Sequence, residues 1–372
     1  MKVVQVITGL GVGGAEGQLR LLLRHLPQER VECRVVTLTN PGPIADAIRA
    51  DGTAVTHLGM AGNRDLRAVH RLVRVIQAGG FDVVHTHLYR ACVYGRIAAR
   101  LAGVRAVVAT EHSLGESQIE GRPLSAGTRA LYRATERLGS GTAAVSATVA
   151  RRLREWGVAD DRIHLAPNGI DPARFRFDPA VRATARGRLG LPAGAYAVAG
   201  VGRLVQAKRF DLLVRAAAAN PGTWLLLSGG GPEREGLLRL AAALGAADRV
   251  RVVSAQDGGP DVLEVLAAAD LFVSPSPEEA FGLAVVEALA AGLPVLYAAC
   301  PAIEDLPPEA APGASRIGGG PGELAAAIGR QRRAGGPARL PVPPAVDTYH
   351  IAHTADRVLA LYESALASAR KK

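Results

Sequence analysis

Two acidic residues eight positions apart flank the start of a predicted helix late in the chain. Residues 273–296 read VSPSPEEAFGLAVVEALAAGLPVL, with Glu279 before an apolar helical stretch and Glu287 inside it. Eight residues make a little over two helical turns, so the two carboxylates are expected on one face about 12 Å apart. The N–H groups of Gly282 and Leu283, at the start of this helix, would form an anion site. Carboxylates around a phosphate cradle suit a nucleotide-sugar, with one acid on the ribose and the other facing the sugar.

Two cations follow an earlier predicted strand. In the stretch GVGRLVQAKRFDLLVRAA, Arg203 comes just after a strand over 197–201, and Lys208 precedes the next helix. Arginine offers a planar fork of donors and lysine a point charge, and both bind phosphate groups. They could also stabilise a departing diphosphate as its charge develops. The alternative is a pair of ordinary surface cations in an arginine-rich protein.

A glycine-rich loop near the N-terminus, GLGVGG at residues 9–14, has G-x-G-x-x-G spacing. A dinucleotide site also needs an acidic residue at the end of the next strand, and here that strand ends in Thr39 and Asn40. We therefore do not expect a nicotinamide or flavin oxidoreductase. The loop is expected to bring backbone N–H groups to an anionic ligand. A tight turn that needs a positive φ is the alternative.

The segments that must position these residues alternate between apolar strand-like runs and amphipathic helical ones. One series occupies residues 3–166 and a second occupies 197–298, and the proline-rich stretch PNGIDPARFRFDPA at 167–180 separates them. This alternation predicts parallel sheets with helices on both faces. Ligands bind such sheets at the carboxyl ends of the strands, so two facing domains would share a deep cleft.

We predict two α/β domains of similar size, 1–175 on the acceptor side and 176–346 as the nucleotide-sugar domain. Residues 347–372 are expected to form a helix that packs back on the first domain. The helix itself is predicted from about Asp347 to Leu366 by its apolar periodicity.

Composition restricts the class of protein. Hydrophobic residues make up 48% of the 372, with no apolar run long enough to span a membrane, and the formal net charge is +10. Most of this excess, +8, falls within residues 1–175 and favours an anionic partner. Aromatic residues are only 4% and no nucleic-acid-binding module is recognisable, so no nucleic-acid partner is expected. Three scattered cysteines indicate a reducing compartment, hence a cytoplasmic protein without disulfides.

Taken in order, these motifs resemble one known family. GGAE at 13–16, TEHS at 110–113, PNGID at 167–171, GRLVQAKR at 202–209 and the E-x7-E segment occur in the family's sequence order. The chain resembles the retaining glycosyltransferases of family 4 over nearly its whole length. The resemblance implies a GT-B fold, with two Rossmann-like doubly wound domains. It also implies transfer of a sugar from a nucleoside diphosphate to an acceptor hydroxyl with retention of configuration.

The resemblance also assigns roles to residues. His112 and Glu279 would act at the reacting centre, next to the transferred sugar. The residues that would bind the donor are Gly13, Gly14, Arg203, Lys208, Phe281, Gly282, Leu283 and Glu287. No metal ion or other cofactor is expected, and the sequence contains no D-x-D motif. His85 and His87 share one side of a strand and could suggest a metal, but without a third ligand we expect an acceptor-side or structural role.

The chain departs from the family pattern in two places. Ala280 stands where glycine is usual, and AACPAIEDLPPEAAPG follows the strand at 294–297 where a Gly-Gly loop with a following acid is common. The donor sugar is therefore not inferred from better-known members. A nucleotide-sugar epimerase or hydrolase of the same fold, or a non-catalytic sugar-nucleotide-binding protein, remains the alternative.

A basic amphipathic helix is predicted over residues 63–80. Its apolar face would hold Leu66, Val69, Val73 and Ile76, and its basic face Arg64, Arg67, Arg71 and Arg74. One reading is peripheral contact with the anionic inner face of a membrane and an acceptor that is a polysaccharide or lipid-linked intermediate. The other is a solvated arginine face and a small-molecule acceptor such as a natural product.

Overall fold

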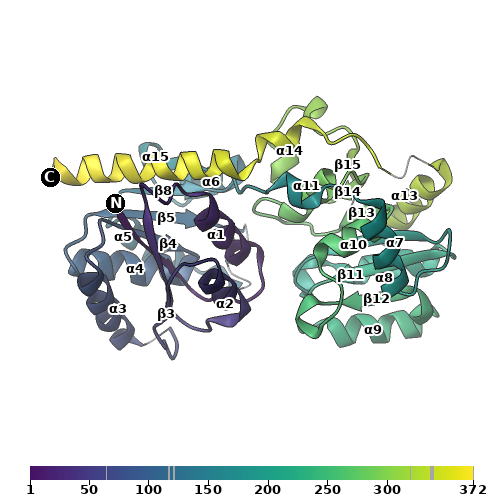
Figure 1. Cartoon of the computed structure of the whole chain (residues 1–372), viewed down its shortest axis with the longest axis horizontal. Coiled ribbons are helices and arrows are strands. Elements are labelled where there is room, and N and C mark those ends of the chain that lie inside the picture. The colour runs from purple at the N-terminus through teal and green to yellow at the C-terminus, as the bar shows by residue number, and fades with distance from the viewer. Residues whose placement is uncertain (64, 116–117, 120–121, 319, 336–338, 372) are drawn as a thin grey trace. The chain divides into compact units, whose positions relative to one another are not determined.

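The chain folds into two α/β units, each built on its own parallel sheet (Figure 1). The structure is a computed structural model that describes residues 1–63, 65–115, 118–119, 122–318, 320–335 and 339–371. The first unit comprises Met1–Gly169 together with Ile351–Lys372, and the second comprises Ile170–His350.

The first unit holds seven parallel strands in the order β3-β2-β1-β4-β5-β8-β9. The strands are β1 (Lys2–Ile7), β2 (Glu32–Thr37), β3 (Val55–His57), β4 (Val83–His87), β5 (Ala106–Glu111), β8 (Gly141–Ala144) and β9 (Ile163–Leu165). A two-stranded antiparallel hairpin, β6 (Gln118–Ile119) with β7 (Arg122–Pro123), follows β5. The helices are α1 (Gly14–His25), α2 (Gly42–Ala50), α3 (Leu66–Gly79), α4 (Tyr89–Leu101), α5 (Ala126–Glu136), α6 (Ala147–Glu155) and α15 (Ile351–Arg370).

Helices cover both faces of this sheet, as its apolar strands require. In β4 and β5 every residue is buried, which is typical of central strands in a parallel sheet. Helices α3, α4 and α5 pack side by side on one face, while α1, α2 and α15 cover the other. Parallel register aligns the last residues of the central strands, with Ile7 beside His87 and His87 beside Thr110.

The C-terminal helix α15 belongs to this first unit although it is the last element of the chain (Figure 1). It packs on β4, β5, β8 and α1. The buried face of α15 consists of Ile351, Thr354, Ala355, Val358, Leu359, Leu361, Tyr362 and Ala365.

The second unit holds six parallel strands in the order β12-β11-β10-β13-β14-β15. The strands are β10 (Tyr196–Val201), β11 (Thr223–Ser228), β12 (Val250–Val253), β13 (Leu271–Ser274), β14 (Val295–Tyr297) and β15 (Ala314–Arg316). The helices are α7 (Pro179–Arg188), α8 (Phe210–Ala219), α9 (Arg234–Ala243), α10 (Val262–Ala268), α11 (Leu283–Ala290), α12 (Pro301–Glu304), α13 (Pro321–Ala334) and α14 (Pro344–Thr348). The core forms between the sheet and helices α8, α9 and α13.

Helix α7 and the end of the chain differ from the sequence-based expectation. Helix α7 was not expected, because only Ala185 of its ten residues is buried and the apolar period is missing. The predicted final helix is broken, since α14 ends at Thr348 and α15 begins at Ile351. Tyr349 and His350, between the two helices, lie at the point where the chain passes from the second unit to the first.

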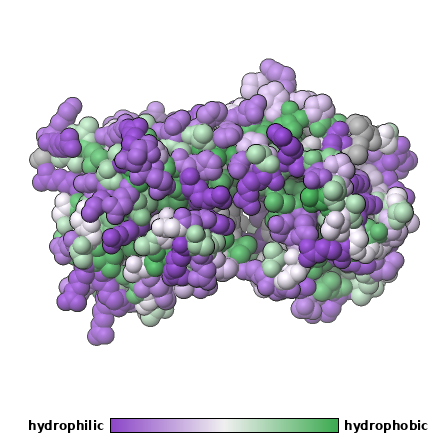
Figure 2. Space-filling model, viewed as in Figure 1, coloured by the Kyte–Doolittle hydropathy of each residue, from purple (hydrophilic) through white to green (hydrophobic). Residues whose placement is uncertain are grey.

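Hydrophilic side chains predominate on the face shown in Figure 2, and apolar ones are scattered among them over both units. The larger apolar side chains are mostly drawn into the cores. Leu66 is an exception, with 77% of its surface exposed at the start of α3. The predicted apolar face of α3 is therefore correct for Val69, Val73 and Ile76, which pack on the core, and wrong for Leu66, while Ala68 and Leu72 complete the buried stripe.

Candidate active site

The second unit brings Lys208 and Glu279 together at the carboxyl ends of two neighbouring strands. Lys208 lies in a short 3-10 helix after β10, and Glu279 lies in the loop after β13. The ammonium Nζ of Lys208 and Oε1 of Glu279 are 2.5 Å apart, and both side chains are partly buried. Arg203 follows β10 at the same edge of the sheet. The structure thus joins one carboxylate and one cation from segments 71 positions apart, with the exposed Arg203 following the same strand as Lys208.

The two acids of the E-x7-E segment do not share a helix face, which corrects the expected geometry. Helix α11 begins only at Leu283, so Glu279 lies in the preceding loop and Glu287 in the second turn. Burial raises the pKa of the Glu287 carboxyl to about 7, against a smaller opposing effect of the Arg174 charge. Glu287 is therefore a carboxyl group that changes its charge near neutral pH.

Gly282, directly before α11, has a backbone conformation that any other residue would adopt only with strain. Gly282 has φ +100°, and a Cβ there would lie 2.5 Å from Sγ of Cys300. The first N–H groups of α11 have no partner within the helix and attract anions. The Phe281 side chain is only 3% exposed and stacks edge-on against Tyr349. Because its side chain is buried, Phe281 can contact a ligand only through its backbone.

Strained backbone marks both units at the predicted sites. Among the described residues, Leu88 and Arg209 are the two non-glycine residues with positive φ, at +73° and +53°. Leu88 directly follows His87, and Arg209 directly follows Lys208. Such conformations cost about 1–3 kcal/mol each and cluster at functional sites.

The first unit carries a cluster of three histidines at the carboxyl ends of β4 and β5. His85 and His87 are fully buried, and Nδ1 of His87 lies 3.1 Å from Nε2 of His112. The other nitrogen of His87, Nε2, lies 2.9 Å from Oε1 of Gln5 in β1. Burial lowers the pKa of His85 to about 3 and that of His112 to about 4, and it lowers the pKa of His87 as well. All three rings are thus neutral near pH 7.

The glycine loop leads into α1, which begins at Gly14 with Gly13 as its N-cap. Gly13 is extended, with φ −167°, so its backbone does not itself demand glycine. A Cβ on Gly13 would instead meet Oε2 of Glu16 at 2.3 Å. Because the Glu16 carboxylate ends a flexible side chain, it could move aside, so this contact does not by itself require glycine. The N–H groups that start α1 lie beside Gly13.

Sequence reasoning missed several polar residues of these sites. Gln5 is a fully buried amide inside the apolar run KVVQVI, and that contrast was the available signal. Tyr362 on α15 completes the same cluster but lies 357 positions away from Gln5, so no local pattern could have indicated it.

A second missed feature is the triple glycine at residues 229–231, directly after β11. A Cβ on Gly229 would lie 2.0 Å from the carbonyl oxygen of Gly202, the residue before Arg203. The N–H of Leu204 also donates to the carbonyl oxygen of Gly230 at 2.8 Å. The two loops at this edge therefore hold each other in place. A glycine run after a buried strand was the signal in the sequence.

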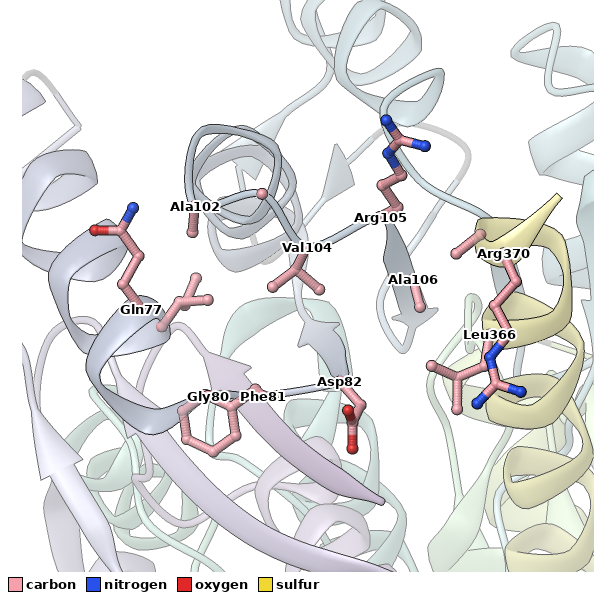
Figure 3. Close-up of a pocket in the computed structure, with 13 residues that line it drawn as sticks. Gln77, Gly80, Phe81, Asp82, Ala102, Val104, Arg105, Ala106, Leu366 and Arg370 are labelled. Carbon is pink, nitrogen blue, oxygen red and sulfur yellow. The ribbon is translucent and has the colours of Figure 1, made fainter. Parts of the chain in front are cut away.

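A surface groove of about 430 Å³ in the first unit lies at the opposite edge of the sheet. Asp82 and Arg105 precede β4 and β5, Gln77 comes from α3, and Leu366 and Arg370 come from α15 (Figure 3). None of the predicted site residues lines it. Parallel sheets bind ligands at the other edge, so the groove is not the candidate site.

In the part of the chain that the structure describes, no group of three or more His, Cys, Asp or Glu side chains is placed to hold a metal ion. None of the described helices combines the length and the apolar character that crossing a membrane requires.

Comparison with known proteins places the chain in a family. The profile of Glycosyltransferase Family 4 matches residues 12–174, and that of Glycosyl transferases group 1 matches residues 181–328. A D-inositol 3-phosphate glycosyltransferase of Acidothermus cellulolyticus is 36% identical over 82% of this chain and 71% of its own length. A D-inositol 3-phosphate glycosyltransferase of Catenulispora acidiphila is 33% identical over 86% of this chain and 83% of its own length.

Solved structures show the same fold. HepE of Anabaena, crystallised with UDP and glucose, superposes with a TM-score of 0.83 at 21% identity, covering 98% of this chain and all of HepE. WaaG, a glycosyltransferase of lipopolysaccharide biosynthesis, superposes with a TM-score of 0.66 at 19% identity, covering all of this chain and 95% of WaaG. The chain therefore belongs to glycosyltransferase family 4 and is a glycosyltransferase with the GT-B fold.

Proposed function

We propose that the protein transfers a sugar from a nucleoside diphosphate to an acceptor hydroxyl, with retention of configuration and without a metal ion. The observation that carries the proposal is the Lys208–Glu279 pair in front of the N-terminus of α11. A cation and free helix N–H groups suit a diphosphate, and a carboxylate beside them suits a sugar. These groups can stabilise the charge that develops on the leaving diphosphate, which a divalent ion does in other enzymes.

The donor would bind mainly to the second unit. Arg203 and Lys208 hold the diphosphate, Gly282 and Leu283 donate backbone hydrogen bonds, and Glu287 accepts from the ribose hydroxyls. Glu279 and His112 are assigned to the transferred sugar, and Gly13 and Gly14 are assigned to the diphosphate. The leaving phosphate helps to deprotonate the acceptor, so Glu279 is not a glycosidase-type nucleophile.

UDP-glucose is the first donor to test. HepE, whose fold matches over the whole chain, was crystallised with UDP-glucose as well as with UDP. The departures at Ala280 and at Cys300–Pro301 leave the sugar open, so the panel includes other UDP-sugars and GDP-, ADP- and dTDP-glucose.

A phosphorylated polyol is the first acceptor to test. The curated relatives at 33–36% identity are D-inositol 3-phosphate glycosyltransferases. The excess positive charge of the first 175 residues suits an anionic acceptor. Inositol without its phosphate is the matched control, because it presents the same hydroxyls without the charge.

Contact with an anionic membrane is a separate part of the proposal, carried by α3. Arg67 and Arg74 are exposed on this helix, next to the exposed Leu66. Arg71 instead pairs with Asp65 at 2.8 Å, and Arg64 lies outside the described residues. Co-sedimentation with vesicles of phosphatidylglycerol, lost in Arg67→Glu/Arg74→Glu and at high salt, is expected. Equal recovery with neutral and anionic vesicles would exclude this contact and favour a soluble acceptor.

The central experiment is release of nucleoside diphosphate from each donor, with and without acceptor. Acceptor-dependent release that persists in EDTA, with an α-linked product from an α-linked donor, is expected. Turnover of the donor that does not depend on acceptor would instead indicate an epimerase or hydrolase. Donor binding without any turnover across the panel would indicate a non-catalytic sugar-nucleotide-binding protein.

A further inference from the structure

A continuous set of buried polar side chains in the first unit connects the C-terminal helix with His112. Tyr362 of α15 contacts Gln5 of β1, and Gln5 contacts His87, which contacts His112. The corresponding distances are 2.9 Å, 2.9 Å and 3.1 Å. A side branch runs from the Tyr362 hydroxyl to Nδ1 of His85 at 2.7 Å.

Once the Gln5 amide is oriented as the structure has it, the chemistry of the histidines fixes the direction of each hydrogen bond that follows. Oε1 of Gln5 is only an acceptor, so Nε2 of His87 must carry the proton. The His87 ring is neutral, because burial lowers its pKa, and its Nδ1 is therefore bare. That lone pair accepts from Nε2 of His112, which leaves Nδ1 of His112 as the bare nitrogen of a neutral ring.

The contact with Tyr362 is part of the observed orientation of the Gln5 amide. Nε2 of Gln5 donates to the Tyr362 hydroxyl, so Oε1 faces His87. Because the hydroxyl accepts from Gln5, its one hydrogen is available to donate to Nδ1 of His85. Nε2 of His85 then donates to Oγ1 of Thr110 at 2.7 Å. If the amide were reversed, the hydroxyl would have to donate to Gln5, and every proton in the series would move to the other nitrogen.

A purely structural role accounts poorly for this arrangement. Burying a carboxamide in an apolar strand costs free energy that an aliphatic residue would not, and Gln5 is completely buried. The backbone next to His87 is also strained, with Leu88 at φ +73°. Gln5 contacts His87, and Leu88 directly follows it in the chain.

We propose that Gln5 and Tyr362 are positioning residues that set the protonation pattern of His112. Through His87 they keep the proton of His112 on Nε2 and its lone pair on Nδ1. The inference rests on the proposed function, in which His112 lies at the transferred sugar. Nδ1 is buried and meets the geometric criteria for a hydrogen bond with none of the described residues, while the polar side chain of Asn168 raises the pKa of the ring against the larger lowering effect of burial. The bare Nδ1 is thus the atom of His112 able to accept a hydrogen bond.

Long-range ¹⁵N NMR of the full-length protein shows directly which ring nitrogen of each histidine carries the proton. The signals of His87 and His112 are assigned by their loss in His87→Gln and His112→Gln. In the unsubstituted protein both rings are expected to be protonated at Nε2. In Gln5→Met, which removes the acceptor at similar length, protonated Nδ1 should appear in both rings. A His112 protonated at Nδ1 in the unsubstituted protein, or rings unchanged in Gln5→Met, would overturn the proposal.

Tyr362→Phe and Cys33→Ala provide a second variant and a matched control. Tyr362→Phe removes only the hydroxyl that orients the amide, so a mixture of both tautomers is expected even if Gln5→Met fails to fold. Cys33 lies 3.7 Å from the same amide nitrogen, and its removal should leave both rings as they were. Unchanged tautomers in Tyr362→Phe would exclude a role for Tyr362.

Kinetics then test whether the protonation pattern matters for transfer. Gln5→Met is expected to lower kcat about tenfold, the effect of losing one buried hydrogen bond. UDP affinity should change less than twofold, because the diphosphate site lies in the second unit. An unchanged kcat would overturn the positioning role. Absence of transfer by the unsubstituted protein would count against the proposed function alone, since the NMR result does not depend on turnover.

Discussion

Single side chains in the second unit are expected to separate donor binding from turnover, and Lys208 is the first to test. In Lys208→Ala the diphosphate loses its point charge, and Glu279 loses the partner 2.5 Å away. We expect kcat with the preferred donor to fall at least about 100-fold, as for removal of one charge-stabilising group elsewhere. Arg215→Ala, an exposed cation on α8, is the matched control and should keep full activity. A folded Lys208→Ala protein with near-normal turnover would contradict the assigned role.

Glu287 should make both stability and donor binding depend on pH, in opposite directions. Its folded pKa of about 7 lies above the ordinary value, so the fold favours the protonated form. This stabilising contribution is complete below pH 4.5 and is lost as the pH rises through 7. Glu287→Gln is therefore expected to have a higher Tm than the unsubstituted protein at pH 8 and a similar Tm at pH 4.5.

Donor binding should show the reverse trend at Glu287. An ionised carboxylate is the better acceptor for ribose hydroxyls, so UDP affinity should weaken as the pH falls from 8 to 6. Glu287→Gln should bind UDP more weakly at pH 8 and lose this pH dependence. Glu235→Gln, at an exposed position on α9, is the control for both measurements. A Tm difference independent of pH, or a UDP affinity that keeps its pH dependence, would rule out Glu287 as the group responsible.

Among the elements, α7 shows what a sequence can and cannot reveal. The alternation of strands and helices follows from local apolar periods, so most of the two sheets could be predicted. Helix α7 lacks such a period and is held instead by arginines. Arg182 donates to the last carbonyls of α10 and to Asp270, and Arg186 reaches the same carboxylate. Side-chain partners more than 80 positions away leave no trace in a local pattern.

In the candidate site, too, some features could be predicted from the sequence and others could not. Arg203, Lys208, Glu279 and Glu287 could be named because each stands at a strand end or helix start in a recognisable motif. Glu279 was correctly expected before the helix and Glu287 inside it, but the expected common helix face was wrong, because Glu279 lies in the loop before Leu283. The amide and tyrosine behind His112 were missed because their contacts join opposite ends of the chain.

Asp270 links α7 to the end of α10 through ion pairs with Arg182 and Arg186, so removing its charge tests how much this link stabilises the fold. Its Oδ1 accepts from Arg182, and its Oδ2 accepts from the N–H of Ala197 at 2.8 Å. Asp270→Asn leaves two partly buried guanidinium groups without a counter-charge, which should lower the free energy of unfolding by about 2–3 kcal/mol. Urea unfolding measures this change, with the exposed Asp248→Asn as control. A midpoint equal to that of Asp248→Asn would show that hydrogen bonds to the α10 carbonyls suffice.

At the scale of the whole molecule, the first unit is built from both ends of the chain and the second from a continuous segment. Helix α15 therefore completes the first unit only after the second has been synthesised. Its buried face includes Val358, Leu359, Leu361 and Tyr362. Burying a large apolar side chain contributes about 1.5–3 kcal/mol, so four of them rival the net stability of a domain, about 5–15 kcal/mol.

The two units should consequently behave differently as fragments. Residues 170–350 are expected to unfold cooperatively and to be stabilised by UDP, since most of the proposed diphosphate and ribose contacts lie there. Residues 1–169 are expected to lack a cooperative transition until a peptide of residues 351–372 is added. The same peptide with Val358→Asp and Leu361→Asp is the control and should not restore it. Native-like unfolding of residues 1–169 alone would mean that α15 is an accessory to the first unit, and a fragment 170–350 that folds without binding UDP would move the donor contacts to the first unit.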